Sequence, residues 1–259
     1  MYPILFQIGP FSLHSLWLFV SIAFVAGILA FAKIAKRQRL DLSMLFHHSL
    51  SITVITILFS RIVFYFMNLQ FYLPTFRLGG LLRFFYIWDK GLSFWGAILG
   101  LTIMMIIICF KKNESILKWI DALVIPVGLG IIIANFGQLL DGQGYGTPTN
   151  LPWGMTYESI NVKYTVPIHP TQIYSMLYVG GILFFIKKHR QYEFFKKEGN
   201  ISLFAITFYS FVRFWMEFLR GDDTIDILGI RLAAIISAII FLISGYILFK
   251  RYKKSHIPN

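Results

Sequence analysis

Seven apolar stretches recur along the chain, and each is about long enough to cross a bilayer as a helix. They cover roughly residues 14–34, 46–68, 91–110, 118–140, 170–187, 201–219 and 230–249. Of all residues 57% are hydrophobic and only 14% are charged, which excludes an ordinary soluble domain. The sequence therefore predicts an all-α integral membrane protein with seven transmembrane helices, folded as one polytopic domain over residues 1–259.

Lysine and arginine gather on one side of this alternating pattern. The first, third and fifth connections and the C-terminal tail hold 16 of the 24 basic residues. Loops rich in Lys and Arg stay in the cytoplasm, so we expect the N-terminus outside and the C-terminus in the cytoplasm. The net charge of +12 then reflects orientation in a lipid bilayer and attraction to its headgroups, and not nucleic-acid binding.

Two connections on the outer side are long. Residues 69–90 are rich in aromatic and basic side chains, which is typical of a segment at the membrane interface. Residues 141–169 are rich in Gly, Pro, Asn and Thr, which favour turns. Chemistry on this extracytoplasmic side would concern an outer-leaflet lipid or an exported chain.

The sixth apolar stretch carries charges at membrane depth. Tyr209, Arg213 and Glu217 follow one another at intervals of four, and Arg220 is seven residues after Arg213, so a helix would present all four on one face. A charge in mid-membrane costs from about 3 kcal/mol upward, and such groups usually face a bundle interior or a watery cavity. Two interpretations stay open: a structural ion pair, or a guanidinium that holds an anion.

Polar residues also cluster at the end of the fourth stretch. Asn135, Gln138 and Asp141 are spaced by three and fall on one helical face. Glycines at 142, 144 and 146 should end the helix there and leave backbone N–H groups exposed. Exposed amides beside cations can bind a phosphate.

Three further sites have an ordinary and a functional interpretation. Arg61 in the second stretch either snorkels to the interface or faces a site. The glycines in residues 91–100 would permit close helix packing. His169 precedes Pro170, which fits the first turn of a helix, and is either a polar anchor, a base or a phosphate ligand. The single cysteine, Cys109, has no Cys or His neighbours at ligand spacing and is interpreted as a small apolar residue. The sequence shows no metal cluster and no nucleotide motif, so we expect no metal and no cofactor.

The motifs taken in order resemble those of the prolipoprotein diacylglyceryl transferase family, seven-helix enzymes of bacterial inner membranes. The segments that carry the resemblance are IGPFSLHSLW, ILFSRIVFY, DKGLSFWGAILG, PVGLG with NFGQLLDGQGYG, IHPTQIYS and YSFVRFWMEFLRGDD. They run over nearly the whole chain. The resemblance implies transfer of a diacylglyceryl group from phosphatidylglycerol to the lipobox cysteine thiol of an exported prolipoprotein, with release of glycerol phosphate.

The resemblance also implies a set of site residues. Arg213 would hold the phosphate, Glu217 would orient Arg213, and His169 is the candidate proton acceptor. Residues expected to bind substrate are Arg61, Asn135, Gln138, Asp141, Gly142, Gly146, Gln172, Tyr174, Tyr209 and Arg220. The implied location is the bacterial cytoplasmic (inner) membrane.

Several positions depart from the family pattern. Asn135 falls where the signature has arginine, although another alignment matches the family's Asn-Phe pair to Asn135 and Phe136. Trp95 replaces a histidine and Ser175 a glutamate. Three readings therefore stay open: a lipid-modifying transferase, a non-catalytic paralogue that binds phospholipid or a lipoprotein precursor, and a transporter or channel.

Overall fold

Helices form at all seven apolar stretches. The computed structural model describes residues 2–9, 11–68, 91–157, 162–227 and 229–256. The long helices are α1 (Ser15–Arg37), α3 (Ser49–Met67), α6 (Phe94–Lys111), α7 (Ile116–Asp141), α8 (Thr171–His189), α10 (Asn200–Glu217) and α11 (Leu232–His256). Five of them, α1, α3, α6, α7 and α11, are long and apolar enough to cross a membrane. The prediction of a helical integral membrane protein is confirmed at this level.

The shorter elements include strands that the sequence analysis did not expect. Helices α2 (Ser43–His47) and α9 (Glu193–Lys196) are single turns. Strands β1 (Ile4–Ile8) and β2 (Phe11–His14) form one antiparallel hairpin, and β3 (Asp226–Ile227) pairs with β4 (Ile230–Arg231) in another. A stretch of only two to five residues has too little pattern to reveal a strand in the sequence.

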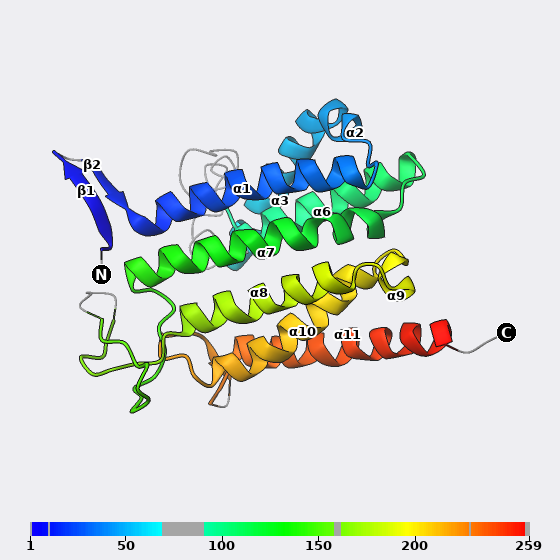
Figure 1. Cartoon of the computed structure of the whole chain (residues 1–259). Helices are drawn as coiled ribbons and strands as arrows, with labels where there is room; N and C mark the ends of the chain where they lie inside the picture. The colour runs from blue at the N-terminus through cyan, green and yellow to red at the C-terminus, as the bar shows by residue number, and fades with distance from the viewer. Residues whose placement is uncertain (1, 10, 69–90, 158–161, 228, 257–259) are drawn as a thin grey trace. The chain divides into compact units, whose positions relative to one another are not determined.

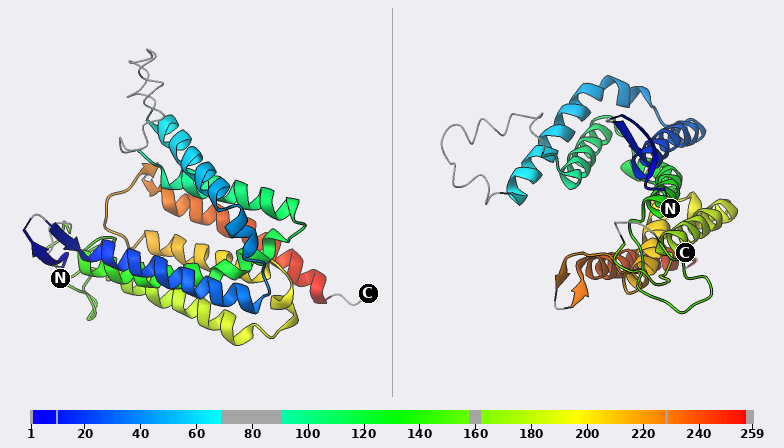
Figure 2. Two further views of the ribbon diagram at one scale, coloured as in Figure 1. Left: turned by 90° about the horizontal axis from the view of Figure 1, so that it is seen from above. Right: turned by 90° about the vertical axis from the view of Figure 1, so that its left-hand side faces the viewer.

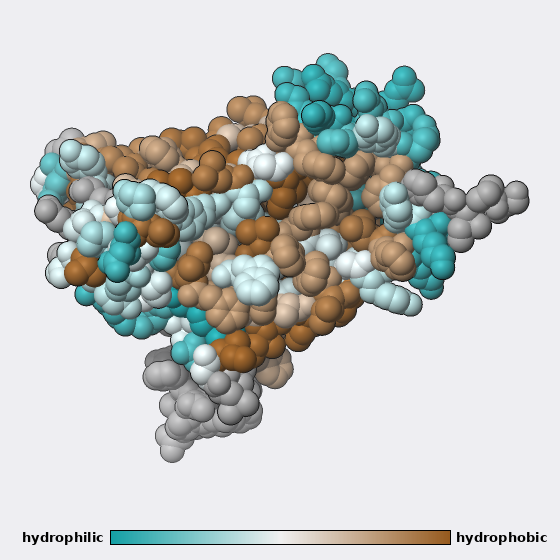
Figure 3. All heavy atoms as spheres, turned by 60° about the horizontal axis from the view of Figure 1, so that its bottom comes forward, coloured by the Kyte–Doolittle hydropathy of each residue, from teal (hydrophilic) through white to brown (hydrophobic). Residues whose placement is uncertain are grey.

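The chain divides into two units, which are described separately. Unit 1 comprises Met1–Gln38 and Ile120–Asn259, and unit 2 comprises Arg39–Trp119. In unit 1, both hairpins and the connection between α7 and α8 lie at one end of the helices. Helix α9 and the C-terminal end of α11 lie at the opposite end (Figures 1 and 2). Apolar side chains cover the middle of these helices, and hydrophilic ones gather toward their ends (Figure 3).

In unit 2, glycines allow α3 and α6 to pack closely. A Cβ atom on Gly96 would lie 2.4 Å from the Phe59 carbonyl oxygen, and one on Gly100 would lie 2.9 Å from that of Ile55. Next to this contact the Ser60 hydroxyl donates a 2.8 Å hydrogen bond to the Ser93 carbonyl. The packing interpretation of these glycines is therefore confirmed.

A buried carboxylate fixes the start of α10. Asp121 on α7 is 8% exposed, and its two oxygens accept from the amides of Gly199 (2.6 Å) and Ser202 (2.8 Å). The first amides of a helix have no partner within it, and a negative charge there also complements the helix dipole. Asp121 thereby ties α7 to α10, and hence to the charged residues further along α10.

Candidate functional site

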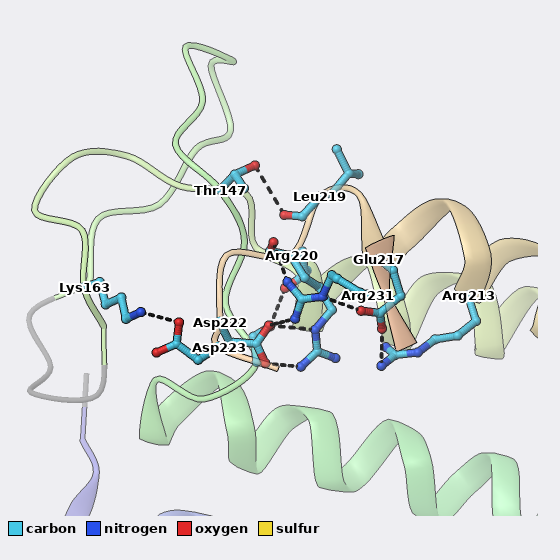
Figure 4. Close-up of polar contacts among 11 residues, drawn as sticks. Thr147, Lys163, Arg213, Glu217, Leu219, Arg220, Asp222, Asp223 and Arg231 are labelled. Atoms are coloured by element: carbon cyan, nitrogen blue, oxygen red, sulfur yellow. Dashed lines mark hydrogen bonds and ion pairs between the residues drawn. The ribbon is translucent and has the colours of Figure 1, made fainter. Parts of the chain in front are cut away.

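The C-terminal end of α10 holds a carboxylate between two guanidinium groups. Glu217, the last residue of α10, is 2% exposed. Its Oε1 lies 2.5 Å from Nη2 of Arg213, and its Oε2 lies 2.9 Å from Nε of Arg231 on β4 (Figure 4). Both contacts are short enough to be ion pairs. Neither is a hydrogen bond, because Glu217 Oε1 and Arg231 Nε have no hydrogen-bond partner among the described residues. The expected Arg213–Glu217 pair is present, and Arg231 is an addition that sequence reasoning missed.

A second carboxylate extends this group of charges. Asp222 accepts from Arg220 through both oxygens, with a distance of 2.9 Å from Arg220 Nε to Oδ1. Arg231 also donates to Asp222 Oδ1 at 2.8 Å and to the Arg220 carbonyl oxygen at 2.9 Å. We call these five residues, Arg213, Glu217, Arg220, Asp222 and Arg231, the arginine cluster. Three guanidinium groups face two carboxylates, so the cluster has one positive charge in excess.

The two arginines decide the ionisation of Asp222. Burial by itself would raise the pKa of this carboxyl group, but its hydrogen bonds and attraction to Arg220 and Arg231 hold the pKa below its usual range. Asp222 is therefore ionised at neutral pH, and the excess positive charge of the cluster stays at one.

The prediction that Arg220 lies on the helix face of Arg213 was wrong. Helix α10 ends at Glu217, and Arg220 instead forms an antiparallel bridge with Gly146. The next amide, that of Gly221, donates to the Tyr145 carbonyl at 3.0 Å. Arg220 thus reaches the cluster because the chain after α10 pairs with the connection between α7 and α8.

The turn after α7 forms as predicted, but the amides of Gly142 and Gly146 are already hydrogen-bonded. Helix α7 ends at Asp141, and Gly142 and Gly144 adopt φ of 80° and 66°, which favour glycine. The Gly142 amide donates to the Gln138 carbonyl at 2.9 Å, and the Gly146 amide donates to the His169 carbonyl at 3.1 Å. The expectation that these two amides are available to a phosphate was therefore wrong.

Side chains at the start of α8 hold this turn in place. Gln172 is 1% exposed, and its Nε2 donates to the Gln143 carbonyl at 2.7 Å. Its Oε1 accepts from Tyr157 at 3.3 Å, and Thr171 donates to the Gly144 carbonyl. Burial raises the pKa of Tyr157 to about 12, which keeps the phenol a donor. Gln172 thus contacts the protein backbone and shapes the turn.

The three polar residues expected on one face of α7 have different surroundings: Asn135 and Asp141 bind neighbours in the chain, and Gln138 lies beside Arg220. The Asn135 amide donates to the Ile131 carbonyl of its own helix at 2.8 Å, and buried Asp141 accepts from Gln143 at 2.7 Å. Gln138 faces the site. A Cβ atom on Gly144 would lie 3.3 Å from Gln138 Oε1 and 3.7 Å from Arg220 Nη2, so both side chains flank the same glycine.

His169 and Tyr174 lie together, next to the segment around Gly146 that pairs with Arg220. His169 Nδ1 is 3.3 Å from the Tyr174 hydroxyl, which accepts a 2.7 Å hydrogen bond from the indole N–H of Trp153. The His169 carbonyl also binds the Gly146 amide, next to the bridge to Arg220. Trp153 was not predicted, because its partner is 21 residues away in the sequence.

An apolar cavity of about 660 Å³ lies among α7, α8, α10 and α11. Tyr209 lines it, and it stands one helical turn before Arg213 on the same helix. The ring of Tyr209 is 5.6 Å from that of Tyr178 on α8. The site therefore combines a cationic cluster with an apolar space beginning one turn away.

Gly91 and Phe64, both in unit 2, are partners of Arg61. It is 3% exposed, its Nη1 donates to the Gly91 carbonyl at 2.8 Å, and its guanidinium lies 5.8 Å from the Phe64 ring. A side chain buried to this extent does not snorkel to an interface, so that interpretation was wrong.

Comparisons with known proteins give one family. The family model described as prolipoprotein diacylglyceryl transferase matches residues 3–250. A phosphatidylglycerol–prolipoprotein diacylglyceryl transferase of Finegoldia magna is 35% identical over 65% of this chain and 64% of its own length. Proteins of the same name from Prochlorococcus marinus and a Wolbachia strain are 29% and 27% identical over 95% and 85% of this chain, and over 88% and 82% of their own lengths. The chain therefore belongs to the prolipoprotein diacylglyceryl transferase family.

Proposed function

We propose that this protein transfers a diacylglyceryl group from phosphatidylglycerol to the lipobox cysteine thiol of an exported prolipoprotein. The observation that carries the proposal is the arginine cluster, with its excess positive charge, one helical turn from an apolar cavity. A phospholipid has the matching chemistry, since an anionic phosphodiester is joined to two acyl chains. The family match and the names of the relatives favour this reaction over a non-catalytic paralogue or a transporter.

In the proposed reaction the thiolate sulfur forms a bond to the terminal glyceryl carbon. The bond from that carbon to the phosphate oxygen breaks, and glycerol phosphate leaves. Negative charge grows on the leaving phosphate, so fixed cations there lower the barrier. Arg213 binds this phosphate, while Glu217 holds Arg213 in place and Arg220 adds a second guanidinium. Gln138, beside Gly144, donates a hydrogen bond to the same headgroup.

The proton of the thiol needs an acceptor, because the thiolate is the nucleophile. His169 is the proposed base. Trp153 donates to Tyr174 Oη, which leaves the Tyr174 hydroxyl free to donate to His169 Nδ1. In that tautomer the imidazole proton is on Nε2, so Nε2 cannot accept the thiol proton. When His169 instead donates from Nδ1 to Tyr174, Nε2 is free to accept the thiol proton, and substrate binding would select this second tautomer.

The arrangement of unit 1 supports the membrane orientation that we propose. Seven helices cross the bacterial cytoplasmic membrane as one polytopic domain, with the N-terminus outside and the C-terminus inside. The C-terminal end of α10, which carries Arg213 and Glu217 of the arginine cluster, lies at the end of unit 1 that also holds the N-terminal hairpin (Figure 1). The Lys-rich end of α11 lies opposite, which agrees with the positive-inside rule. The site then faces the outer leaflet, where an exported prolipoprotein arrives.

A direct assay tests the reaction. The purified protein is mixed in detergent with phosphatidylglycerol and a lipobox peptide, and both glycerol phosphate release and the mass of the peptide are followed. We expect one diacylglyceryl group added per peptide cysteine, and no addition to a Cys→Ser peptide. If a relative with the complete signature is active under the same conditions and this protein is not, the proposal is wrong and the non-catalytic reading takes its place.

A further inference from the structure

We infer that unit 1 has a second lipid site, a groove at the C-terminal end of α11 that binds one phospholipid with an anionic headgroup. This groove has a volume of about 750 Å³ and lies among α8, α9, α10 and α11. It is lined by residues that do not line the cavity beside Tyr209. The inference does not depend on the proposed reaction, because it concerns the opposite end of these helices.

The walls of the groove suit an acyl chain. Phe185 of α8, Phe204 and Phe208 of α10 and Phe249 of α11 are among the aromatic residues that line it. The Phe185 and Phe204 rings stack with centroids 5.0 Å apart, and Phe208 is 4.3 Å from Phe204. Rings with fixed neighbours give a preformed apolar surface, which loses little side-chain entropy when a chain binds.

Two segments that contribute residues to the groove lining are rich in basic residues. Residues 187–198 and 250–254 contain nine lysines and arginines but only two glutamates. One of these glutamates, Glu193, is 2.5 Å from Lys196, and Arg251 donates to Asn200 Oδ1 at 2.8 Å. Lys197 is exposed and lines the groove itself. A phosphate group above the aromatic walls would therefore meet Lys197 and lie next to segments with an excess of basic residues.

These observations favour a lipid over a soluble protein partner. The groove lies at the ends of three long helices, two of them rich in apolar residues exposed to the surroundings, such as Phe184 and Leu242. With the orientation proposed above, it opens at the inner leaflet, where aromatic rings and lysines are typical of the headgroup region. An anionic phospholipid matches the apolar walls, Lys197 and the neighbouring basic segments with one molecule.

The test uses the full chain in nanodiscs that contain phosphatidylglycerol with a photoreactive acyl chain. After illumination, labelled residues are located by peptide mass spectrometry. Residues 192–195 and 248–252 report on the groove, because none of them lines the cavity near Tyr209. We expect label there, and we expect unlabelled phosphatidylglycerol to compete at least tenfold better than phosphatidylcholine. Equal competition by phosphatidylcholine, or no label at these residues, overturns the proposal.

Matched glycine variants give a second readout. Gly245 lines the groove, and the nearest atom to a Cβ placed there is 3.8 Å away, so Gly245→Phe introduces a ring without a backbone clash. Gly181→Phe is the control, since a Cβ there meets nothing within 4 Å and Gly181 lines neither cavity. We expect Gly245→Phe to reduce groove labelling at least fivefold and Gly181→Phe to leave it unchanged. Equal labelling of both variants would contradict the proposed site.

Discussion

Each end of α10 contacts a buried carboxylate, but the groups that bind the two carboxylates differ. At the start of the helix, Asp121 is held by two backbone amides and faces no cation in those contacts. At the other end, Glu217 lies between the guanidinium groups of Arg213 and Arg231. Both carboxylates are less than 10% exposed. Backbone amides bind Asp121, whereas guanidinium groups bind Glu217. The first contact joins two helices, and the second belongs to the candidate site.

The comparison supports the proposed anion site at the C-terminal end of α10. The amides of Gly199 and Ser202 are neutral, and both donate to the Asp121 carboxylate. The arginine cluster keeps one positive charge in excess after its internal pairs are formed. A phosphate would complete the charge balance of the cluster, and this is the physical reason to place the reaction at the C-terminal end of α10.

The largest effect should come from Glu217→Ala, which leaves three guanidinium groups facing only Asp222. Removing one partner of a buried ion pair costs about 3 to 5 kcal/mol. Thermal unfolding in detergent should show the loss, and transfer activity should fall with it. The control is Glu193→Ala, which removes an exposed carboxylate paired with Lys196 and should leave both quantities unchanged. Equal unfolding temperatures for the two variants would refute the central role of Glu217.

The next effect should come from Arg213→Ala. Loss of one charged donor to a developing anion reduces turnover by about 100-fold or more. The matched control is Lys163→Ala, because Lys163 forms an exposed ion pair with Asp223 at the same end of unit 1. Lys163→Ala should keep full activity. Wild-type turnover by a correctly inserted Arg213→Ala protein would exclude Arg213 from the site.

A smaller effect is expected at the start of α10. Asp121→Ala leaves two amides without their acceptor, and loss of a helix cap costs about 1 to 2 kcal/mol. The unfolding temperature should fall, while turnover per folded molecule at low temperature should stay close to that of the wild type. A fall in turnover as large as that of Arg213→Ala would show that the two ends of α10 are not separable.

The smallest effect concerns pH. The folded pKa of Asp222 lies below its usual value, so this carboxylate stabilises the fold at neutral pH and loses that contribution as the pH falls through the folded pKa. The unfolding temperatures of wild type and Asp222→Asn should therefore differ at pH 7 and converge below about pH 4. A constant difference over this range would mean that titration of Asp222 contributes nothing.

Patterns local in the sequence predicted much of this molecule. The seven apolar stretches each became a helix, because length and hydrophobicity act within one segment. The Arg213–Glu217 pair also followed from spacing alone, since residues four apart on a helix are neighbours. The end of α7 at Asp141 followed from the glycines after it.

Contacts between distant segments were decided only by the tertiary structure. Arg231 is 14 residues after Glu217 and on a two-residue strand, so no periodic pattern connects them. The partners of Asp121 are 78 and 81 residues away, and an aspartate in an apolar helix gives no sign of which helix it caps. Arg220 was assigned to the wrong element because the spacing continued beyond the true end of α10. Sequence alone thus determined the helices and one ion pair, and tertiary packing decided which charges share a site, because long-range electrostatic partners depend on chain folding and not on spacing.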